Sequence, residues 1–504
     1  MKILLVYPHY PDTFWSFKHA LKLVSIKAAF PPLGALTVAS MLPPDWEKRL
    51  VDMNVSPLTD SDIKWADYVF ISAMVVQKKS VQEIVGRCNQ LGVKIVAGGP
   101  LFTTEPEAFS GIDHFILNEA EITLPLFLAD LRAGVPLKTY STDLHPDITQ
   151  TPVPMWSLIK KTMYKYSSMN LQYSRGCPFN CEFCDITYLD GRLPRTKSRE
   201  QVLVELDSLY SAGWRGDLFF VDDNFIGNKK KLKEETLPAI IDWMEKRKYP
   251  FSFLTEVSVN LADDEELMTL MSKAGFVKVF VGIETPNEAS LSECDKKQNV
   301  SRDLIATVKI LQNRGFEVMA GFIVGFDQDP PSIFKTQISF IQRSGIVTAM
   351  VGLLNAPRGT RLYQRLKKEN RLVADSSGDN TDFSLNFIPR MKKETLIRGY
   401  KEILNVIYHP TNYYARVSTL LKEYKPKARS WKLHSTRWNV QGLFNSLWLM
   451  GFREPGRFQY WKLMLATLFR RPKSLPLFIT LSIYGYHFRR VVERYVNTME
   501  GEMA

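Results

Sequence analysis

The chain has little cysteine, little histidine and no long apolar run. Its 504 residues include five cysteines and seven histidines, and these cysteines are too few and too unevenly spread for a disulfide framework. The N-terminus, MKILLVYPHYP, has one lysine and a five-residue apolar run before an early proline, so it lacks the pattern of a secretory signal peptide. The longest apolar run of the C-terminal region, Leu475 to Tyr486, is short of the ~20 residues that a bilayer span needs. We expect a multidomain protein of the reducing cytoplasm.

The net charge of +12 is concentrated near the C-terminus. Residues 425–494 hold fourteen lysines and arginines but only two acidic residues, so the rest of the chain is neutral overall. Four tryptophans lie in the same stretch: Trp431, Trp438, Trp448 and Trp461. Three interpretations stay open: peripheral membrane contact through 425–494, a solvated helical cap, and nucleic-acid binding. No recognised nucleic-acid-binding motif accompanies the charge, so we expect no nucleic-acid partner.

Short apolar runs alternate with helical patterns from residue 1 to about residue 135. Strands are predicted at Ile3–Tyr7, Arg49–Asp52, Tyr68–Ser72, Lys94–Ala97 and His114–Leu117, and helices at Gly34–Met41, Ser80–Leu91 and Ala120–Leu131. This alternation is typical of a doubly wound, Rossmann-like parallel sheet, in which ligands bind beyond the carboxyl ends of the strands. The loop after Tyr7, PHYPDTF, lacks the G-x-G-x-x-G pattern of a dinucleotide fold. Glycines after Ala97 let a large planar ligand approach the backbone.

A second alternating series follows a stiff proline-containing connection, TPVPMWS. Strands are predicted at Met169–Ser174, Asp217–Asp222, Phe251–Val257, Val277–Ile283, Glu317–Val324 and Ile346–Leu353. A capping box at Ser198 and Gln201 and the acids Asp263 and Asp264 mark helix starts. Six strand–helix units predict an open, partial (β/α)6 barrel. Beyond residue 375 the spacing is helical, so the predicted domains are 1–150, 151–375 and 376–504.

Three of the five cysteines lie within CPFNCEFC, at Cys177, Cys181 and Cys184. Zinc and plain packing are the alternatives to weigh, but a zinc site closes with four ligands and no second cysteine pair is present. Soft thiolates otherwise indicate an iron–sulfur cluster, which normally has four cysteine ligands. Three thiolates leave one iron free to bind a small molecule. Cys88 and Cys294 are isolated, and we expect them to be buried thiols.

The segment YSRGCPFNCEFCDI resembles the motif of the radical S-adenosylmethionine (SAM) enzymes. The resemblance implies that Cys177, Cys181 and Cys184 bind a 4Fe-4S cluster whose open iron chelates SAM, and that these cysteines serve catalysis. It also implies that an electron breaks a bond of SAM to give a 5′-deoxyadenosyl radical. The electron donor would be a reductase, a flavodoxin or a ferredoxin.

Further residues match that family at the carboxyl ends of its strands. The resemblance places SAM contacts at Asp222, Asp223 and Asn224, with a helix-capping turn as the alternative. Glu256 and Glu284 end otherwise apolar strands, where a buried carboxylate needs a partner; a ligand ribose or ammonium is one choice and a structural salt bridge the other. The segment GFIVGF resembles the strand that runs beside adenine, which implies contacts from Gly321, Ile323 and Gly325.

The N-terminal domain resembles the cobalamin-binding domain found in many radical SAM enzymes. The cobalt-ligating D-x-H-x-x-G motif is missing, and His9 and His19 are wrongly spaced to replace it. We therefore expect the lower face of the corrin to meet a histidine-free loop. The predicted contacts are Ser72, Met74, Val75 and Gln77 from that loop and Gly98 and Gly99 from the next. The role of the Asn118–Glu121 stretch stays open.

The combination of segments is similar to the group with a helical C-terminal extension that includes hopanoid methylases. This resemblance implies a cobalamin-dependent radical SAM enzyme that methylates an unactivated carbon of a hydrophobic, lipid-like small molecule. The alternatives are a radical oxidation or rearrangement without methylation, and a non-catalytic sensor that carries an iron–sulfur cluster and a corrinoid. Localisation is predicted as cytoplasmic, with membrane association through the basic C-terminal stretch as a further option.

Overall fold

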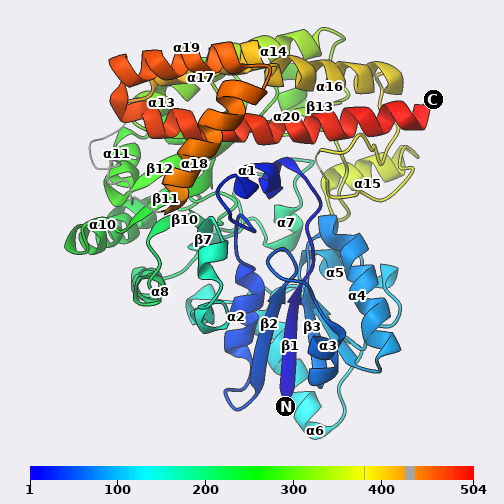
Figure 1. Ribbon diagram of the computed structural model, residues 1–504. Helices are drawn as coiled ribbons and strands as arrows, with labels where there is room; N and C mark the ends of the chain where they lie inside the picture. Colours follow the sequence, from blue (N-terminus) through cyan, green and yellow to red (C-terminus); the bar gives the residue numbers. More distant parts are fainter. Residues whose placement is uncertain (380, 426–436, 504) are drawn as a thin grey trace.

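The computed structural model describes residues 1–379, 381–425 and 437–503. Three layers follow the order of the chain (Figure 1). The N-terminal sheet lies at one end, a second sheet with its helices lies in the middle, and the C-terminal helices lie across the far side, where α20 (Leu475–Met503) crosses the molecule.

Six parallel strands form the N-terminal sheet, in the order β2-β1-β3-β4-β5-β6. Their bounds are β1 Lys2–Tyr7, β2 Glu47–Asp52, β3 Tyr68–Ser72, β4 Lys94–Gly98, β5 His114–Ile116 and β6 Thr139–Tyr140. Alternate residues of β1 point to opposite faces, so both faces are apolar and both are covered. Helices α2 (Leu33–Met41) and α6 (Ala120–Ala133) pack on one face; α3 (Asp60–Trp65), α4 (Lys78–Gln90) and α5 (Pro100–Thr104) pack on the other. The doubly wound prediction is confirmed, and the strand order reverses between β1 and β3.

The middle sheet is a half-barrel of six parallel strands in the order β14-β13-β12-β11-β10-β7. Its strands are β7 Ser168–Leu171, β10 Gly216–Phe220, β11 Phe251–Val257, β12 Phe276–Glu284, β13 Glu317–Val324 and β14 Ala349–Leu353. The intervening helices are α8 (Arg199–Ser211), α10 (Leu237–Lys246), α11 (Glu265–Ala274), α13 (Leu304–Asn313) and α14 (Ile333–Ser344). The open, six-stranded prediction is confirmed, and β11 and β13 have the predicted bounds.

Helix starts in the half-barrel follow the predicted caps. The Ser198 hydroxyl accepts a hydrogen bond from the Gln201 amide at 3.2 Å, and the Gln201 side chain accepts one from the Ser198 amide at 3.3 Å. At α11, the Asp264 carboxylate accepts from the amide of Leu267 at 3.0 Å. The same helix ends at Gly275, whose φ of 110° suits glycine.

The segment 14–30 of the N-terminal domain covers the open side of the half-barrel, which sequence patterns did not predict. Ala28 forms a parallel bridge with Tyr166 just before β7, so the segment extends the edge of the sheet. Trp15 packs on Phe280 of β12 with ring centroids 5.0 Å apart. The short helix α1 (Lys18–Lys22) then packs against α20.

The C-terminal layer is helical, as predicted. It consists of α15 (Arg361–Lys368), α16 (Lys393–Tyr408), α17 (Pro410–Glu423), α18 (Arg437–Trp448), the π-helix η11 (Leu449–Arg453), α19 (Arg457–Arg470) and α20. Tyr400 and Tyr408 of α16 donate hydrogen bonds to the carbonyls of β14, which attaches this layer to the half-barrel. Of the basic stretch 425–494, residues 426–436, with Trp431, lie outside the described residues, as does the side chain of Trp438. Among the described helices, none combines the length and apolar character of a membrane span.

Candidate functional site

The cysteine loop joins two short elements at the edge of the half-barrel, the strand β8 (Ser174–Arg175) and the helix α7 (Ile186–Leu189). Cys181 is buried, and Cys177 and Cys184 are half-buried. Burial raises the pKa of all three thiols. The amide nitrogens of Asn224 and Gln298 lie 4.0 Å from the Cys177 sulfur and 3.9 Å from the Cys181 sulfur.

These three thiols fit a cluster that needs three protein ligands. Soft sulfur donors from one loop suit iron, and the positive charge of Lys296 acts on all three thiols. Throughout the described ranges, no three His, Cys, Asp or Glu side chains converge at the spacing of a single metal ion. Cys88 and Cys294 are buried in the cores, as expected.

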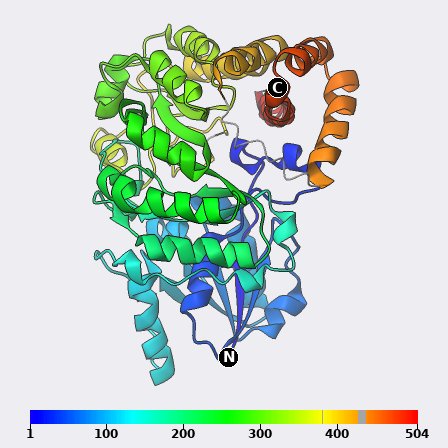
Figure 2. The same ribbon diagram turned by 90° about the vertical axis from the view of Figure 1, so that its left-hand side faces the viewer.

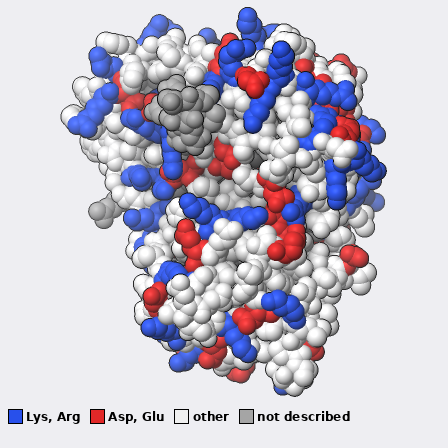
Figure 3. Space-filling view, turned by 90° about the vertical axis from the view of Figure 1, so that its right-hand side faces the viewer, with Lys and Arg blue, Asp and Glu red and all other residues white. Residues whose placement is uncertain are grey.

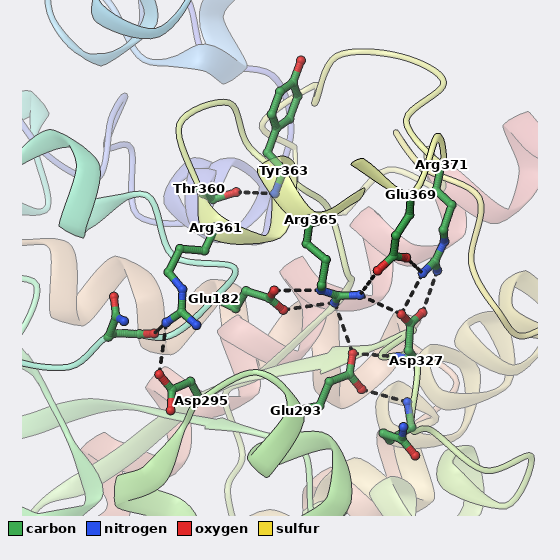
Figure 4. A network of polar contacts seen from close by, with 12 residues as sticks. Glu182, Glu293, Asp295, Asp327, Thr360, Arg361, Tyr363, Arg365, Glu369 and Arg371 are labelled. Carbon is green, nitrogen blue, oxygen red and sulfur yellow. Dashed lines mark hydrogen bonds and ion pairs between the residues drawn. The ribbon is translucent and has the colours of Figure 1, made fainter. Parts of the chain in front are cut away.

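The C-terminal helix α15 clamps the cysteine loop through Glu182 (Figure 4). Arg365 donates to both oxygens of Glu182, at 2.7 and 3.0 Å, and also to Asp327 at 3.0 Å. Arg361 donates to the carbonyl of Asn180 at 2.9 Å. A bidentate arginine–carboxylate pair fixes geometry as well as charge, so α15 positions the loop between Cys181 and Cys184. Sequence patterns did not predict this contact.

Two half-buried carboxylates, Asp223 and Glu256, lie at the ends of neighbouring strands. Asp223 and Glu256 form no side-chain hydrogen bond or ion pair with any residue that the structure describes. Burial, followed by the charge of Glu284, raises the pKa of Glu256 to about 7. Burial, followed by Asp190 and Glu256, holds the pKa of Asp223 well above its usual value. Carboxylates in such surroundings are stabilised by a cation or by N–H donors, and SAM brings a sulfonium and an amino group.

Glu284 forms a salt bridge, which the sequence analysis gave as the alternative to a ligand contact. Its carboxylate lies 2.6 Å from the ammonium of Lys296. Burial opposes the charge on Lys296, but Glu284 and Cys181 outweigh burial and raise its pKa. A bulge between Gly282 and Glu284, where Glu284 has a φ of 63°, turns the carboxylate into the barrel. The sequence analysis missed Lys296, although it lies close to a predicted acid and to the cysteines.

The carboxylate of Asp222 is hydrogen-bonded to other residues of the chain. Its carboxylate is fully buried and accepts hydrogen bonds from the Tyr173 amide at 3.1 Å, the Ser174 hydroxyl at 2.6 Å and the Ser174 amide. Burial raises its pKa to about 6. Asn224 accepts from the Ser258 amide at 3.2 Å. Asp222 therefore orients the strand before the cysteine loop, whereas Asp223 keeps its oxygens available.

The three residues predicted to contact adenine do not all lie at the site. Gly321 and Ile323 lie on the concave face of the half-barrel, where a methyl group at Gly321 would contact Phe280 and lie 4.0 Å from a Glu284 oxygen. Gly325 turns away: its φ is 110°, its amide donates to Asp329 at 2.8 Å, and it packs on Leu396 of α16. The structure therefore brings Gly321 and Ile323 to the site and leaves Gly325 beside it.

A cavity of about 340 Å³ lies between the N-terminal sheet and the cysteine-loop region. Ser72, Gly98 and Gly99 line it from the carboxyl ends of β3 and β4, and Asp190 and Val221 line it from the other side. Side chains at Gly98 and Gly99 would meet the carbonyls of Ile116 and Ala73, so glycine keeps this wall open. The cavity continues between the sheet and the helices α2 and α6. A glycine wall at the carboxyl ends of the strands suits the close approach of a planar ligand such as a corrin.

The remaining predicted corrin contacts lie outside the cavity lining. Gln77 is buried; it donates to the Pro8 carbonyl at 2.6 Å and accepts from the Met74 amide at 2.9 Å. Met74 accepts a hydrogen bond from the Tyr10 hydroxyl at 2.6 Å. These contacts join the loops after β1 and β3. Val75 lies at the junction with the C-terminal part, beside Gly378. None of the described cavity residues is a histidine.

Glu119 and Glu121, at the start of α6, join the N-terminal domain to the segments on either side of the cysteine loop. Arg175 donates to Glu119 at 2.7 Å and to Glu121 at 2.8 Å. Arg195 pairs with Glu119 at 2.8 Å. Burial alone would raise the pKa of Glu121, but Arg175 outweighs it and lowers the pKa. Acidic and basic side chains lie intermixed on this side of the molecule (Figure 3). Arg358 pairs with Glu107 of the N-terminal domain and with Asp375.

The raised pKa of Glu256 predicts a pH-dependent stability of the ligand-free protein. The unfolded carboxyl ionises near its ordinary pKa of 4.5 and the folded one near 7, so the folded state binds the proton more tightly between these values. The free energy of unfolding therefore falls as pH rises through this window, by up to about 3 kcal/mol from this group. We expect Glu256→Gln to flatten melting temperature against pH between about pH 5 and pH 8. Exposed Glu83 provides the control: Glu83→Gln should leave the slope unchanged, and an unchanged slope in Glu256→Gln would contradict the assignment.

Three family descriptions match successive parts of the chain. The B12 binding domain matches residues 21–128, the radical SAM superfamily residues 171–336, and DUF4070, a domain of unknown function, residues 360–500. The chain is 41% identical to uncharacterized methyltransferase sll1242 of Synechocystis sp., over 97% of this chain and 91% of that protein. It is 34% identical to the hopanoid C-2 methylase of Rhodopseudomonas palustris, over 93% and 90% of the two chains. The cobalamin-dependent SAM radical enzyme OxsB, solved with aqua-cobalamin and SAM, shares the fold with a TM-score of 0.63 at 16% identity, over 99% of this chain and 80% of that one.

Proposed function

The chain belongs to the cobalamin-binding radical SAM methyltransferases, and we propose that it methylates an unactivated carbon of a hydrophobic, lipid-like small molecule. Its cofactors are a 4Fe-4S cluster, SAM and cobalamin. When bound, the cluster and SAM supply the hydrogen-abstracting radical, and cobalamin supplies the methyl group. A low-potential reductase, flavodoxin or ferredoxin supplies the electron.

Each predicted domain has its own role in the proposed function. We assign the corrinoid to residues 1–150 and the cluster and SAM to residues 151–375, whose helix α15 clamps the cysteine loop. Residues 376–504 pack against the half-barrel through α16. Cys177, Cys181 and Cys184 bind the cluster, and Lys296 offsets part of their negative charge. Asp223 and Glu256 accept N–H hydrogen bonds from the SAM amino group that chelates the open iron, since their oxygens lack partners among the described residues.

The proposal of a hydrophobic substrate is based on the apolar concave face of the half-barrel. Phe219, Leu254, Phe280 and Ile323 occupy partly exposed positions on alternate strand residues, on the same face as Glu256. The segment 14–30 faces them: Trp15 packs on Phe280, and Phe30 packs on Phe219 at 5.2 Å. Apolar walls beside a few polar groups suit a hydrophobic ligand and exclude water from the reaction. The similarity to a hopanoid C-2 methylase supports the same substrate class.

The products of SAM test the reaction type. Anaerobically reconstituted protein is incubated with SAM, cobalamin, a low-potential reductant and a hopanoid. We expect 5′-deoxyadenosine and S-adenosylhomocysteine to form in equal amounts, together with a substrate one methyl group heavier. 5′-Deoxyadenosine without S-adenosylhomocysteine would instead indicate a radical oxidation or rearrangement. Failure to cleave SAM at all would favour the sensor.

The position of Trp15 tests the substrate wall separately. Trp15→Ala removes a large apolar ring from the concave face, and losing such a contact costs about 1–3 kcal/mol of binding. We expect KM for a hydrophobic substrate to rise by about tenfold or more, while the rate of SAM cleavage without substrate stays unchanged. Trp46→Ala, a partly buried tryptophan that packs against the N-terminal core, is the control. An unchanged KM in Trp15→Ala would place the substrate elsewhere.

A further inference from the structure

The helices α18 and α19 expose large apolar side chains on their outer sides. On α18 and the adjoining η11 these are Val440, Leu443, Phe444, Trp448 and Phe452. On α19 they are Phe458, Leu465, Leu468 and Phe469, of which Phe458 is 74% and Phe469 79% exposed. We call these nine residues the apolar face. Exposed apolar patches of this kind mark interaction sites.

The apolar face is separate from the packed sides of the same helices. On α18 the opposite side packs inward: Ser446 is buried, and Asn445 donates to the carbonyl of Leu23 at 2.5 Å. On α19 the inward residues are Tyr460, Met464 and Thr467. Trp448 and Phe452 are 5.9 Å apart, and Phe452 and Trp461 are 6.0 Å apart, so aromatic rings connect the two helices. Figure 2 shows α18 along the outer edge of the molecule.

Basic residues surround the apolar face without acidic partners. Within the part of the chain that the structure describes, no carboxylate pairs with Arg453, Arg457, Lys462, Arg470, Arg471 or Lys473. The sole acid of residues 437–473, Glu454, is buried and engaged by Arg489 and Arg490. Arg453 lies over the Trp448 ring at 5.3 Å and Arg457 over the Phe458 ring at 5.2 Å. The surface therefore combines aromatic side chains with uncompensated positive charge.

We propose that the apolar face docks on an anionic lipid bilayer. Tryptophan and phenylalanine partition into the bilayer interface, and arginine and lysine attract anionic headgroups. A second copy of the chain would bring the same positive charges together, which disfavours self-association. The described helices are not membrane spans, so the contact is peripheral.

Docking would also bring the open side of the half-barrel, which the segment 14–30 covers, near the lipid. The inner side of α18 holds the segment 14–30, because Gln441 donates to Ser25 at 2.7 Å and Gly442 lies against Val24. That segment carries Trp15, which lines the concave face. The role of this position rests on the proposed function, since it would give a lipid-like substrate a short route from the bilayer to the concave face. Bilayer binding itself does not depend on the substrate.

Vesicle co-sedimentation of the full chain tests the contact. We expect binding to phosphatidylcholine vesicles with about one-third phosphatidylglycerol at least about tenfold tighter than to phosphatidylcholine alone, and weakening in about 0.5 M NaCl. The triple variant Trp448→Ser, Phe452→Ser, Phe469→Ser should lose binding by about tenfold or more. Leu126→Ser, Leu144→Ser, Leu193→Ser removes equally exposed apolar residues elsewhere and should bind like the unchanged protein.

The outcomes distinguish a bilayer from a second copy of the chain as the partner of the apolar face. Absorbance of the reconstituted cluster and a circular dichroism spectrum confirm that each variant is folded. The proposal is overturned if the unchanged protein ignores anionic vesicles, or if the two triple variants bind alike. Sedimentation velocity is the second readout: a dimer that the Trp448, Phe452, Phe469 variant abolishes, without vesicle binding by the unchanged protein, would assign the surface to a second copy. SAM cleavage without substrate should be equal in all variants, whatever the substrate proves to be.

Discussion

Replacing Cys177, Cys181 and Cys184 with alanine together is expected to reduce iron and sulfide in anaerobically purified protein from about four atoms of each per chain to background. SAM cleavage should disappear with them, because no other thiol lies in the loop. The measurement is iron and acid-labile sulfide analysis beside a SAM-cleavage assay. The loss should be complete rather than partial, since the loop supplies all the protein ligands that we assign to the cluster.

Cys88→Ala provides a matched control for the triple variant. Cys88 is also a buried thiol, but it lies in the core of the N-terminal domain. Its replacement leaves a small cavity and lowers stability by about 1 kcal/mol, while iron content should stay at the level of the unchanged protein. Iron and sulfide retained by the triple variant would contradict the assignment of the three ligands.

Arg365→Met is expected to loosen the cluster without removing a ligand. Arg365 holds Glu182, which lies between Cys181 and Cys184, through two hydrogen bonds from outside the loop. A charge-assisted pair of this kind contributes about 1.5–3 kcal/mol, at the lower end here because the Arg365 side chain is 28% exposed. We expect the rate of iron loss to a chelator to rise by about tenfold or more. The visible spectrum of the intact cluster should remain unchanged, since its ligands remain.

Arg371→Met separates the clamp from a general loss of charge. Arg371 also pairs with Asp327, at 2.6 Å, and with Glu369 at 2.8 Å, but it does not contact Glu182 (Figure 4). Its replacement should lower stability while iron release stays slow. Equal rates of iron release in the two variants would show that the network acts only through stability.

The half-barrel and the N-terminal sheet could be predicted from sequence because their signals are local. Strand periodicity defined Phe251–Val257 and Glu317–Val324 to the residue, and a capping box defined the start of α8. The cysteine spacing could likewise be interpreted within eight residues. Each of these patterns depends on neighbours in the chain, and tertiary packing reinforces them.

The contacts that join distant segments could not be predicted. Arg175 pairs with Glu119 and Glu121 across more than fifty residues, and Arg365 reaches Glu182 across 183. The acidic pair at 222 and 223 shows the same limit. Both residues were predicted to contact SAM, but the fold assigns the oxygens of Asp222 to Tyr173 and Ser174 and leaves those of Asp223 available. Such partners depend on which loops meet at the sheet edge, and no local spacing encodes that.

The most direct test of the account is electron–nuclear double resonance of the reduced protein with SAM labelled with ¹⁵N at its amino group. If three cysteines leave one iron open beside Asp223 and Glu256, the labelled nitrogen will show a hyperfine coupling to the cluster, and Glu256→Gln will weaken SAM binding. A cluster signal that does not change when labelled SAM is added, or a coupling from a nitrogen of the protein in its place, would contradict the open coordination site.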